Sequence, residues 1–404
     1  MGLRNMRALT GLSGAIILAS ITHAGGTLEV PGDAPTIQGA IDLASSGDTI
    51  LIDPATYNET LDLGGKSLTI RGVSGPNLTF IDGGNAGSVI TTGAGGTVTI
   101  DGLNITGGNA NQGGAINAGD SAALTVQDSV ITGNAALRGA GIFSTDGTLT
   151  VVRTRLFDNS AEQFGGGIFS SGMTTVASCL MVRNHAELAG GHVYANADVR
   201  IDGATLVDGT ALQGGGVFIG GSGDITNAIL HGNRDNTGNS EGAHVMGLDV
   251  FTIRYSFIEA LPDSRGGSDG LITGDPGFND PGADNYTLSP GSICIDAGDS
   301  TASLLLTTST DLNGNERVFD DEGTADSGIA DGMGNVVDMG ALEVQPVCAD
   351  ASGDGMVNFA DLNVILDQWN TPGPEGDLDS NGFVDFGDLN ALLDQWGTSC
   401  GGMS

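Results

Sequence analysis

The chain has 404 residues, of which 39% are hydrophobic and only 5% aromatic, so a large core must be built from aliphatic side chains. Its 49 acidic residues outnumber 13 basic ones, which gives a formal net charge of −36. This charge excludes nucleic acid as an expected partner and makes calcium the natural counter-ion. The 69 glycines follow no collagen-like period, so they indicate turns.

The first 24 residues are predicted to be a secretory signal peptide. Arg4 and Arg7 precede an apolar run over residues 8–21, and the sequence THA then has the small-x-small pattern of a cleavage site. The alternative is a membrane anchor, but the run is shorter than the roughly 20 residues of a bilayer span. We therefore expect a secreted or cell-surface protein with no membrane span in the mature chain.

Residues 25–344 are predicted to form a single solenoid domain. At its entry, residues 36–44 have the pattern of a short amphipathic helix, with Ile37 and Ile41 on one side. The sequence GDTILIDPATY follows as the first strand and corner. A helix at this position would cover the open edge of the first coil.

Between Thr97 and Phe257 the sequence repeats at about 25 residues. The first half of the unit is a strand pattern (LTVQDSVITGN, LTVVRTRLFDN), and the second half is a glycine corner before a short apolar strand (GGAIN, GAGIFS, GGGIFS). Equivalent apolar positions are Ile116, Ile142, Ile168, Val193 and Val217. A period of this length with so much glycine predicts stacked strands rather than a helical repeat.

One asparagine recurs at the end of the first half-unit. Stacking the units at the ~4.8 Å spacing of neighbouring strands predicts an asparagine ladder at one turn, where the amide of each member bonds to the next coil. Its predicted members are Asn109, Asn134, Asn159, Asn184 and Asn233. We expect nine or ten coils from near residue 45 to residue 300.

The repeat resembles that of the right-handed parallel β-helix proteins of the pectin-lyase-like superfamily. Its GGAIN and ITGN sequences are also similar to the repeats of chlamydial polymorphic outer-membrane proteins. The later sequences GDPGFNDPGADNYTLSPGSICIDAGDS, DLNGNERVFD and VDMGALE are similar to segments that close such helices. The resemblance implies an all-β, right-handed parallel β-helix, and it implies little about activity.

Catalytic residues are not evident in the repeat. The motifs of polygalacturonases are absent, and Lys66 is the only lysine of the chain. Glu162 and Glu187 occupy equivalent places in adjacent coils, so their carboxylates are the candidates for an acid and nucleophile pair, with two solvated glutamates as the alternative. Asp158, Arg183 and Asp208 form a column of alternating charge that is interpreted as a surface salt ladder.

Two further patterns are interpreted as structural. His192, His231 and His244 share no column in the predicted register, so we expect no histidine metal site. The sequence DLNGNER from Asp311 has alternating oxygen ligands, but it lacks glycine at the sixth position of a calcium loop. A bent acidic loop is the expected structure there.

Residues 345–404 contain two copies of one pattern, DASGDGMVNFADLNVILDQW and DLDSNGFVDFGDLNALLDQW. Each copy places oxygen ligands at positions 1, 3, 5, 9 and 12, a backbone carbonyl at position 7 and glycine at position 6, as calcium loops of the EF-hand type do. The predicted ligands of two calcium ions are Asp350, Ser352, Asp354, Met356, Asn358 and Asp361 in the first copy, and Asp377, Asp379, Asn381, Phe383, Asp385 and Asp388 in the second. Val357 and Val384 are expected to pair the two loops.

The tail resembles a dockerin, because each loop is followed by a helix and no helix precedes it. That resemblance implies docking to a cohesin-like protein or a cell-surface scaffold. Cys348 and Cys400 bracket the tail and are predicted to form a disulfide, while Cys179 and Cys294 have no evident partner.

The sequence therefore favours a secreted surface or carbohydrate-binding β-helix that is attached through a calcium-dependent module. The alternative is a polysaccharide-degrading enzyme, a lyase or glycoside hydrolase, that carries the same module. A catalytic helix should present clustered acids, or an arginine or lysine base, on one outward face, whereas a binding helix should lack such a cluster.

Overall fold

A computed structural model describes residues 25–119, 123–248, 251–261, 268–302, 309–319, 324–344, 349–373, 375–378, 383–394 and 396–397. The predicted signal peptide, residues 1–24, lies outside the described residues. Within the described part of the chain, no helix is long and apolar enough to cross a membrane.

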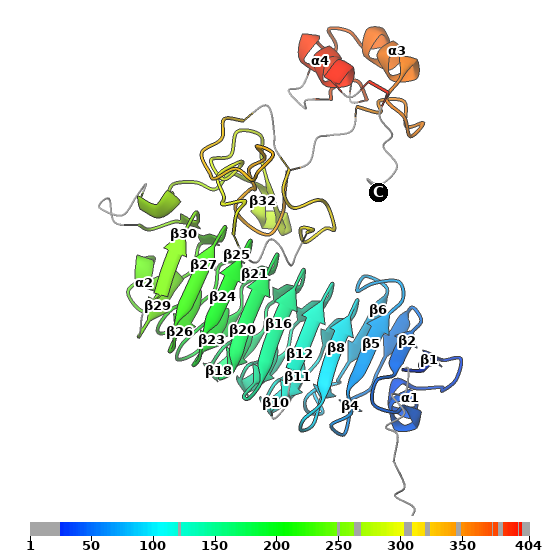
Figure 1. Ribbon diagram of the computed structural model, residues 1–404, viewed down its shortest axis with the longest axis vertical. Coiled ribbons are helices and arrows are strands. Elements are labelled where there is room, and N and C mark those ends of the chain that lie inside the picture. The colour runs from blue at the N-terminus through cyan, green and yellow to red at the C-terminus, as the bar shows by residue number, and fades with distance from the viewer. Residues whose placement is uncertain are drawn as a thin grey trace, which may run out of the picture.

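Residues 27–258 form a parallel β-helix of about nine turns, in which each turn adds one strand to each of three long sheets (Figure 1). Sheet A consists of β1 (Thr27–Val30), β2 (Thr49–Ile52), β5 (Leu68–Gly72), β8 (Thr97–Asp101), β12 (Ala123–Gln127), β16 (Thr148–Val152), β20 (Met173–Ala177), β24 (Val199–Asp202), β27 (Gly223–Thr226) and β30 (Phe251–Arg254). Sheet B consists of β3 (Ala55–Tyr57), β6 (Thr79–Asp82), β9 (Asn104–Thr106), β13 (Val130–Thr132), β17 (Arg155–Phe157), β21 (Leu180–Val182), β25 (Thr205–Val207), β28 (Ile229–His231) and β31 (Phe257–Ile258).

Two further sheets complete the coils. Sheet C consists of β4 (Leu61–Asp62), β7 (Ile90–Thr91), β11 (Ile116–Ala118), β15 (Ile142–Ser144), β19 (Ile168–Ser170), β23 (Val193–Ala195), β26 (Val217–Ile219) and β29 (Val245–Gly247). The shorter sheet D lies between sheets B and C in the middle coils and consists of β10 (Asn109–Gln112), β14 (Ala135–Arg138), β18 (Ser160–Phe164) and β22 (His185–Ala186). The sequence repeat did not predict this fourth sheet.

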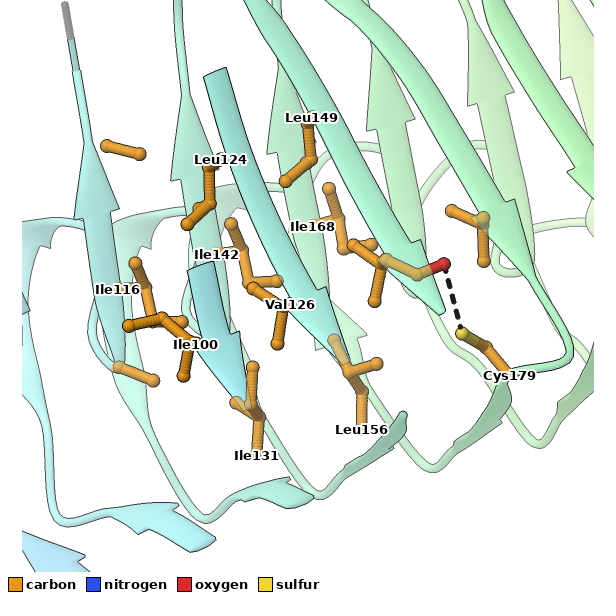
Figure 2. Close-up of a cluster of buried hydrophobic side chains, with 14 of the residues drawn as sticks. Ile100, Ile116, Leu124, Val126, Ile131, Ile142, Leu149, Leu156, Ile168 and Cys179 are labelled. Atoms are coloured by element: carbon orange, nitrogen blue, oxygen red, sulfur yellow. Dashed lines mark hydrogen bonds between the residues drawn. The ribbon is translucent and has the colours of Figure 1, made fainter. Parts of the chain in front are cut away.

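Strict alternation along each strand separates the core from the surface. On sheet A, Ile100, Val126 and Val151 are in register and fully buried, whereas the residues between them point outward. Figure 2 shows how these side chains meet those of the other sheets in one continuous aliphatic core. The thiol of Cys179 lies in the same core and donates to the carbonyl oxygen of Val151 at 3.4 Å.

The outward column of sheet A is rich in threonine. The residues in register along it are Thr27, Thr49, Thr69, Thr99, Thr125, Thr150 and Thr175. Threonine is β-branched, and cross-strand threonine pairs stabilise neighbouring strands by roughly 0.2–1 kcal/mol each. The column therefore favours this register without taking part in the core.

The glycine corners are required by the turn between sheets D and C. Gly165 has a φ of +66°, and a Cβ on it would lie 2.3 Å from the carbonyl oxygen of Ile168. A Cβ on the next residue, Gly166, would lie 2.3 Å from the carbonyl oxygen of His185 in the following coil. These two positions explain why the repeat carries paired glycines.

The predicted asparagine ladder is present in the middle coils. Asn134 donates to Asn159 at 3.0 Å, and Asn159 donates to Asn184 at 2.9 Å, each through Nδ2 to Oδ1. All three side chains are buried. Asn233 has the same place three coils before the end of sheet A's partner strands and accepts from the amide of Gly209 at 2.8 Å.

Asn109 was wrongly assigned to this ladder. It is exposed, it begins β10 and it pairs with Ala135, so the ladder position in that coil is Gly108, whose amide donates to Asn134. The coil from Ile116 to Ile142 is 26 residues long, and a repeat of 25 residues shifts the alignment by one. A shift of one residue moves a side chain to the opposite face of a strand.

The predicted entry helix is α1 (Ile37–Leu43). The hydroxyl of Thr36 caps its N-terminus, and the carboxylate of Glu59 accepts from the amides of Ile37 and Gln38. Lys66 donates to three carbonyl oxygens at the other end of the helix. Carboxylate and ammonium groups therefore satisfy the two ends of α1 according to the helix dipole.

The last coils contain the one-turn helix α2 (Glu241–His244) and end at β31, so the predicted extension of the coils to residue 300 is wrong. The described parts of residues 268–344, the covering segment, include η1 (Ser268–Gly270), η2 (Pro281–Ala283) and an antiparallel pair, β32 (Phe278–Asp280) and β33 (Asn285–Leu288). Apart from the bridge between Phe257 and Ile272, this segment does not plug the open end; it packs on the outward side of sheet B (Figure 1).

Apolar residues explain this lateral position. Leu180, Val182 and Val207 point outward from sheet B and would be exposed without a cover, but Tyr286 and Leu312 of the covering segment pack on them. Burying such side chains contributes about 25 cal/mol per Å² of apolar surface. The strands of sheet B under the segment are therefore buried on both faces.

The C-terminal residues form a separate small core. Its two helices are α3 (Phe359–Asp367) and α4 (Phe386–Asp394). The buried core residues are Ala349, Val357, Ile365, Leu378, Val384 and Leu392. Equivalent residues of the two sequence copies, such as Val357 and Val384 or Ile365 and Leu392, lie in this core together, so the duplication is also a structural one.

Candidate metal centre and surface grooves

Three carboxylates converge in the first predicted calcium loop. One oxygen each of Asp350, Asp354 and Asp361 lies within 4.8 Å of the other two, and this is the one such group among the described residues. The donor set consists of hard oxygen ligands, which suits calcium and not a metal that prefers nitrogen or sulfur. Three residues of the sequence-predicted set are therefore brought together in a geometry that fits a cation.

Backbone amides hold two of these carboxylates in place. Asp350 accepts from the amides of Asp354 and Gly355, and Asp361 accepts from those of Ser352 and Asn358, all at 2.7–3.0 Å. Desolvation opposes ionisation of Asp361, but the amides outweigh it and hold the pKa of this carboxyl below its usual value. The loop is thus shaped around ionised carboxylates.

The other predicted ligands of the first loop have different contacts. The hydroxyl of Ser352 donates to Asp350, and the carbonyl of Met356 accepts from the side chain of Asn358. Asn358 caps α3 with its side-chain oxygen, and its Nδ2 donates to both oxygens of Asp354. In this arrangement the amide nitrogen of Asn358, and not its oxygen, faces the carboxylates.

The second loop is described only in part. Asp379 and Asn381 lie outside the described residues, so its predicted ligand set cannot be assembled. Asp388 accepts from the amides of Leu378 at 2.5 Å and Asp385 at 2.7 Å, the role that Asp361 has in the first loop. Asp377 lies before the gap in the described residues, and the exposed Phe383 follows it.

The two copies interlock through their helix ends. Val357 and Val384 are both buried, but their backbones do not pair with each other as predicted. The carbonyl of Val357 accepts from Gly397 after α4, while Val384 bonds to Asn370 and Thr371 after α3. Each loop is thus tied to the end of the other copy's helix, because the two helices cross-connect the copies.

Aromatic pairs repeat this exchange. Phe359 packs edge-on against Trp396 at 4.9 Å, and Phe386 packs edge-on against Trp369 at 5.1 Å between ring centroids. The sequence identified the two tryptophans as equivalent, and the structure places each against the phenylalanine of the other copy. Both tryptophans of the chain are consequently reporters of this module.

The cysteines divide into two groups. Cys348 and Cys400, the predicted disulfide partners, lie outside the described residues. Cys179 and Cys294 are buried free thiols, and burial raises the pKa of Cys179 to about 12. A thiol with so high a pKa is not a nucleophile at neutral pH.

The glutamate candidates lie on the outward face of sheet D. Ala161 and Ala186 are in register, so Glu162 and Glu187 follow each other in adjacent coils as predicted, and both are exposed. Glu162 borders a hollow of about 540 Å³, but Glu187 does not line it. The rest of that lining comes from β10, β14 and β18.

The charged column on the turn after sheet B has a structural partner that the sequence did not predict. Arg183 binds Asp158 at 2.8 Å and also Asp284 of the covering segment at 2.5 Å. Arg155 likewise donates to Asn313 of that segment at 2.7 Å. These arginines therefore join the β-helix to its cover.

Sequence reasoning missed a buried ionic group beneath the cover. Arg317 is fully buried; it pairs with Glu343 at 2.8 Å and donates to the carbonyl oxygens of Asp338 and Gly340. Its guanidinium lies where a side chain on Gly203 would be, since a Cβ there would be 2.6 Å from Nη2. The signal was the glycine at position 203, but only the fold shows what fills the space.

Asp202, beside that glycine, is the most perturbed carboxyl near the surface of sheet A. Burial raises its pKa to about 6, although Arg317 and Asn227 counteract this. Asn227 donates to one oxygen at 2.9 Å, and the other oxygen has no hydrogen-bond partner. The adjacent hollow of about 20 Å³, bordered by Arg200 and Asp224, has room for a single water molecule.

The remaining motifs are structural. Asp311 of DLNGNER is buried and accepts from the amides of Asn313, Asn315 and Glu343, as expected of a bent loop. His192 and His244 do share a column, contrary to the predicted register, because Val193 and Val245 both pair with Val217. They bind the ladder residues Asn184 and Asn233 and not a common metal.

Neither a protein-family model nor a curated protein matches the sequence. Among solved structures, the pectin methylesterase PemA from Erwinia chrysanthemi is similar, with a TM-score of 0.37 and 13% identity over 66% of this chain and 96% of that chain. A pectin methylesterase in complex with a hexasaccharide is similar with a TM-score of 0.36 and 13% identity, over 62% of this chain and 91% of that one. These proteins are distant in structure and sequence, and the parallel β-helix of this chain is defined by its own strand pairing.

Proposed function

We propose that the chain is a secreted protein whose β-helix binds carbohydrate and whose C-terminal module attaches it, in a calcium-dependent way, to a cohesin-like protein or a cell-surface scaffold. The observation that carries the proposal is the convergence of Asp350, Asp354 and Asp361 within 4.8 Å. Carboxylates at this spacing repel one another, and a divalent cation reverses that repulsion. The second copy of the loop supplies the residues for a second ion.

The module also exposes apolar side chains in duplicate, which supports an attachment role. Phe359 and Phe386 are 71% and 70% exposed, and the pairs Met356 and Phe383, and Leu366 and Leu393, are exposed as well. Each pair is related by the 27-residue repeat. Exposed apolar residues on so small a core are typical of surfaces that bind another protein.

The test uses tryptophan fluorescence of the full chain, because its only two tryptophans, Trp369 and Trp396, lie in the module. We expect a spectral change on addition of Ca²⁺, its reversal by EDTA, and two bound ions per chain by calorimetry. Asp350→Ala combined with Asp377→Ala should abolish both responses, whereas the exposed Asp367→Ala on α3 should leave them unchanged. A module with the same spectrum and no heat of binding in Ca²⁺ would contradict the proposal.

A second candidate function is polysaccharide cleavage, favoured by the adjacent places of Glu162 and Glu187 on sheet D. A retaining glycosidase needs two carboxyl groups about 5 Å apart, one as acid and one as nucleophile. Release of reducing ends from a polysaccharide, lost in both Glu162→Gln and Glu187→Gln but kept in Glu241→Gln, would establish this activity. The absence of such release from neutral and uronate polymers favours the binding role.

A further inference from the structure

The hollow of about 540 Å³ is built by small side chains in the middle of sheet D. In the outward column, Asn109 is followed by Ala135, Ser160 and His185 in successive coils. Alanine and serine cannot fill the space that asparagine and histidine occupy at either end. The column therefore leaves a depression that runs across β10, β14 and β18, along the axis of the β-helix.

The lining combines neutral hydrogen-bonding groups with a small apolar floor. Asn109 and Asn111 offer amides, Ser160 a hydroxyl and Glu162 a carboxylate, while Ala136 and Leu137 provide apolar contact. Amides and hydroxyls both donate and accept, which is what vicinal sugar hydroxyls require. Because strands stack at about 4.8 Å, a chain lying along the axis meets a new set of groups at each coil.

The charge of this hollow discriminates between classes of polymer. Glu162 is the one charged side chain among the described residues that line it. The nearest arginine in sequence, Arg138, is engaged elsewhere: it donates to Gln163 at 2.9 Å and its guanidinium lies 5.7 Å from the ring centre of Phe164. A uronate carboxylate would therefore meet another carboxylate and no cation, on a chain with a net charge of −36.

We propose that this hollow is the carbohydrate site and that it takes a neutral, polyhydroxylated chain, and not a polyuronate. The inference rests on the proposed carbohydrate-binding function and names its place and its ligand class. The ligand lies along the helix axis, over the alanines of β14, with its hydroxyls bound by Asn109, Asn111 and Ser160. Binding of this kind uses hydrogen bonds and apolar contact, so it depends little on salt.

The test is calorimetry on the full chain with three soluble polymers: a neutral glucan, polygalacturonate and chitosan. Each is measured at low salt and at about 1 M salt, where the Debye length falls to about 3 Å. We expect binding of the glucan at both salt concentrations. The variant Ser160→Trp fills the hollow and should weaken glucan binding by about tenfold or more, whereas Thr125→Trp on the outward face of sheet A should not.

The outcomes separate the site from the function. Glucan binding that is equal in Ser160→Trp and the wild type overturns the site and leaves the carbohydrate-binding function standing. Tighter binding of polygalacturonate than of glucan overturns the ligand class, as does binding of chitosan alone that disappears in salt. If the wild type binds none of the three polymers, the carbohydrate-binding function itself fails. Circular dichroism of both tryptophan variants verifies that the β-helix is intact.

Discussion

Single residues at the turns fix the register of the coils. Non-glycine residues such as Asp128, Arg153, Asp158 and Arg183 have positive φ at equivalent turn positions. This conformation costs an ordinary side chain roughly 1–2 kcal/mol, and the stacked hydrogen bonds of the next coil hold it in place. The asparagine ladder beside these turns is the clearest case, because each amide satisfies groups of two coils at once.

Asn159→Ala should destabilise the protein by at least about 2 kcal/mol. Asn159 accepts from the amide and the side chain of Asn134 and donates to Asn184 and Ile131, so its loss leaves several buried polar groups without partners. Asn109→Ala is the matched control: this exposed residue, aligned by sequence with the ladder but not part of it, should change stability by no more than about 0.5 kcal/mol. Urea unfolding of both variants gives the comparison, and equal effects would contradict the observed register.

The buried histidines predict a loss of stability in acid. Burial lowers the pKa of His192 to about 3 and that of His244 to about 4, so both are neutral when folded, whereas an unfolded histidine titrates near 6.5. Their stabilising contribution is complete above pH 6.5 and is lost as the pH falls toward 4, since the unfolded chain binds more protons. His192→Gln should reduce the slope of unfolding free energy against pH by up to about 1.4 kcal/mol per unit in this window. Urea midpoints between pH 4 and 7 measure it, and an unchanged slope would count against a neutral His192.

At the scale of elements, the covering segment and sheet B stabilise each other. Sheet B has apolar residues on both of its faces where the segment lies, and Arg317 enters the notch at Gly203. A buried ion pair contributes little by itself, but the removal of one partner leaves a buried charge behind. The contact therefore has a specific geometry that a purely apolar interface would not impose.

Arg317→Ala should destabilise the protein by about 3–5 kcal/mol, because Glu343 would be left buried without its partner. The segment should then become more open to proteolysis and to amide exchange than the coils beneath it. Arg71→Ala is the control, since Arg71 forms a 3.4 Å ion pair with Asp101 and its side chain is 58% exposed; a change of at most about 1 kcal/mol is expected there. Equal protection of the segment in wild type and Arg317→Ala would sink this account.

At the scale of the whole molecule, the chain contains two cores of different origin. The β-helix core is a long aliphatic stack from Val30 to Leu271, whereas the described core of the module uses only residues 349–392. So small a core is marginal on burial alone, and ion binding supplies the missing free energy. The β-helix core has no such requirement.

Calorimetry should therefore show two transitions that respond differently to EDTA. Removal of calcium should lower or abolish the transition reported by Trp369 and Trp396, while the transition reported by the strand signal in far-ultraviolet circular dichroism stays within about 2 °C. Asp361→Ala in calcium should reproduce the effect of EDTA on the wild type. A single transition that shifts as one unit with calcium would contradict the independence of the two cores.

The sequence by itself determined what repeats. Alternation of apolar residues placed Ile116, Ile142 and Ile168 in one inward column, and the spacing of Asp350, Asp354 and Asp361 predicted a cluster of carboxylates, because both patterns are local and recur at a fixed period. The tertiary structure decided what does not repeat. A coil of 26 residues moved Asn109 out of the ladder, residues 268–344 covered sheet B instead of the open end, and Val357 and Val384 bonded to helix ends and not to each other. These outcomes depend on contacts between residues far apart in the chain, which leave no period in the sequence.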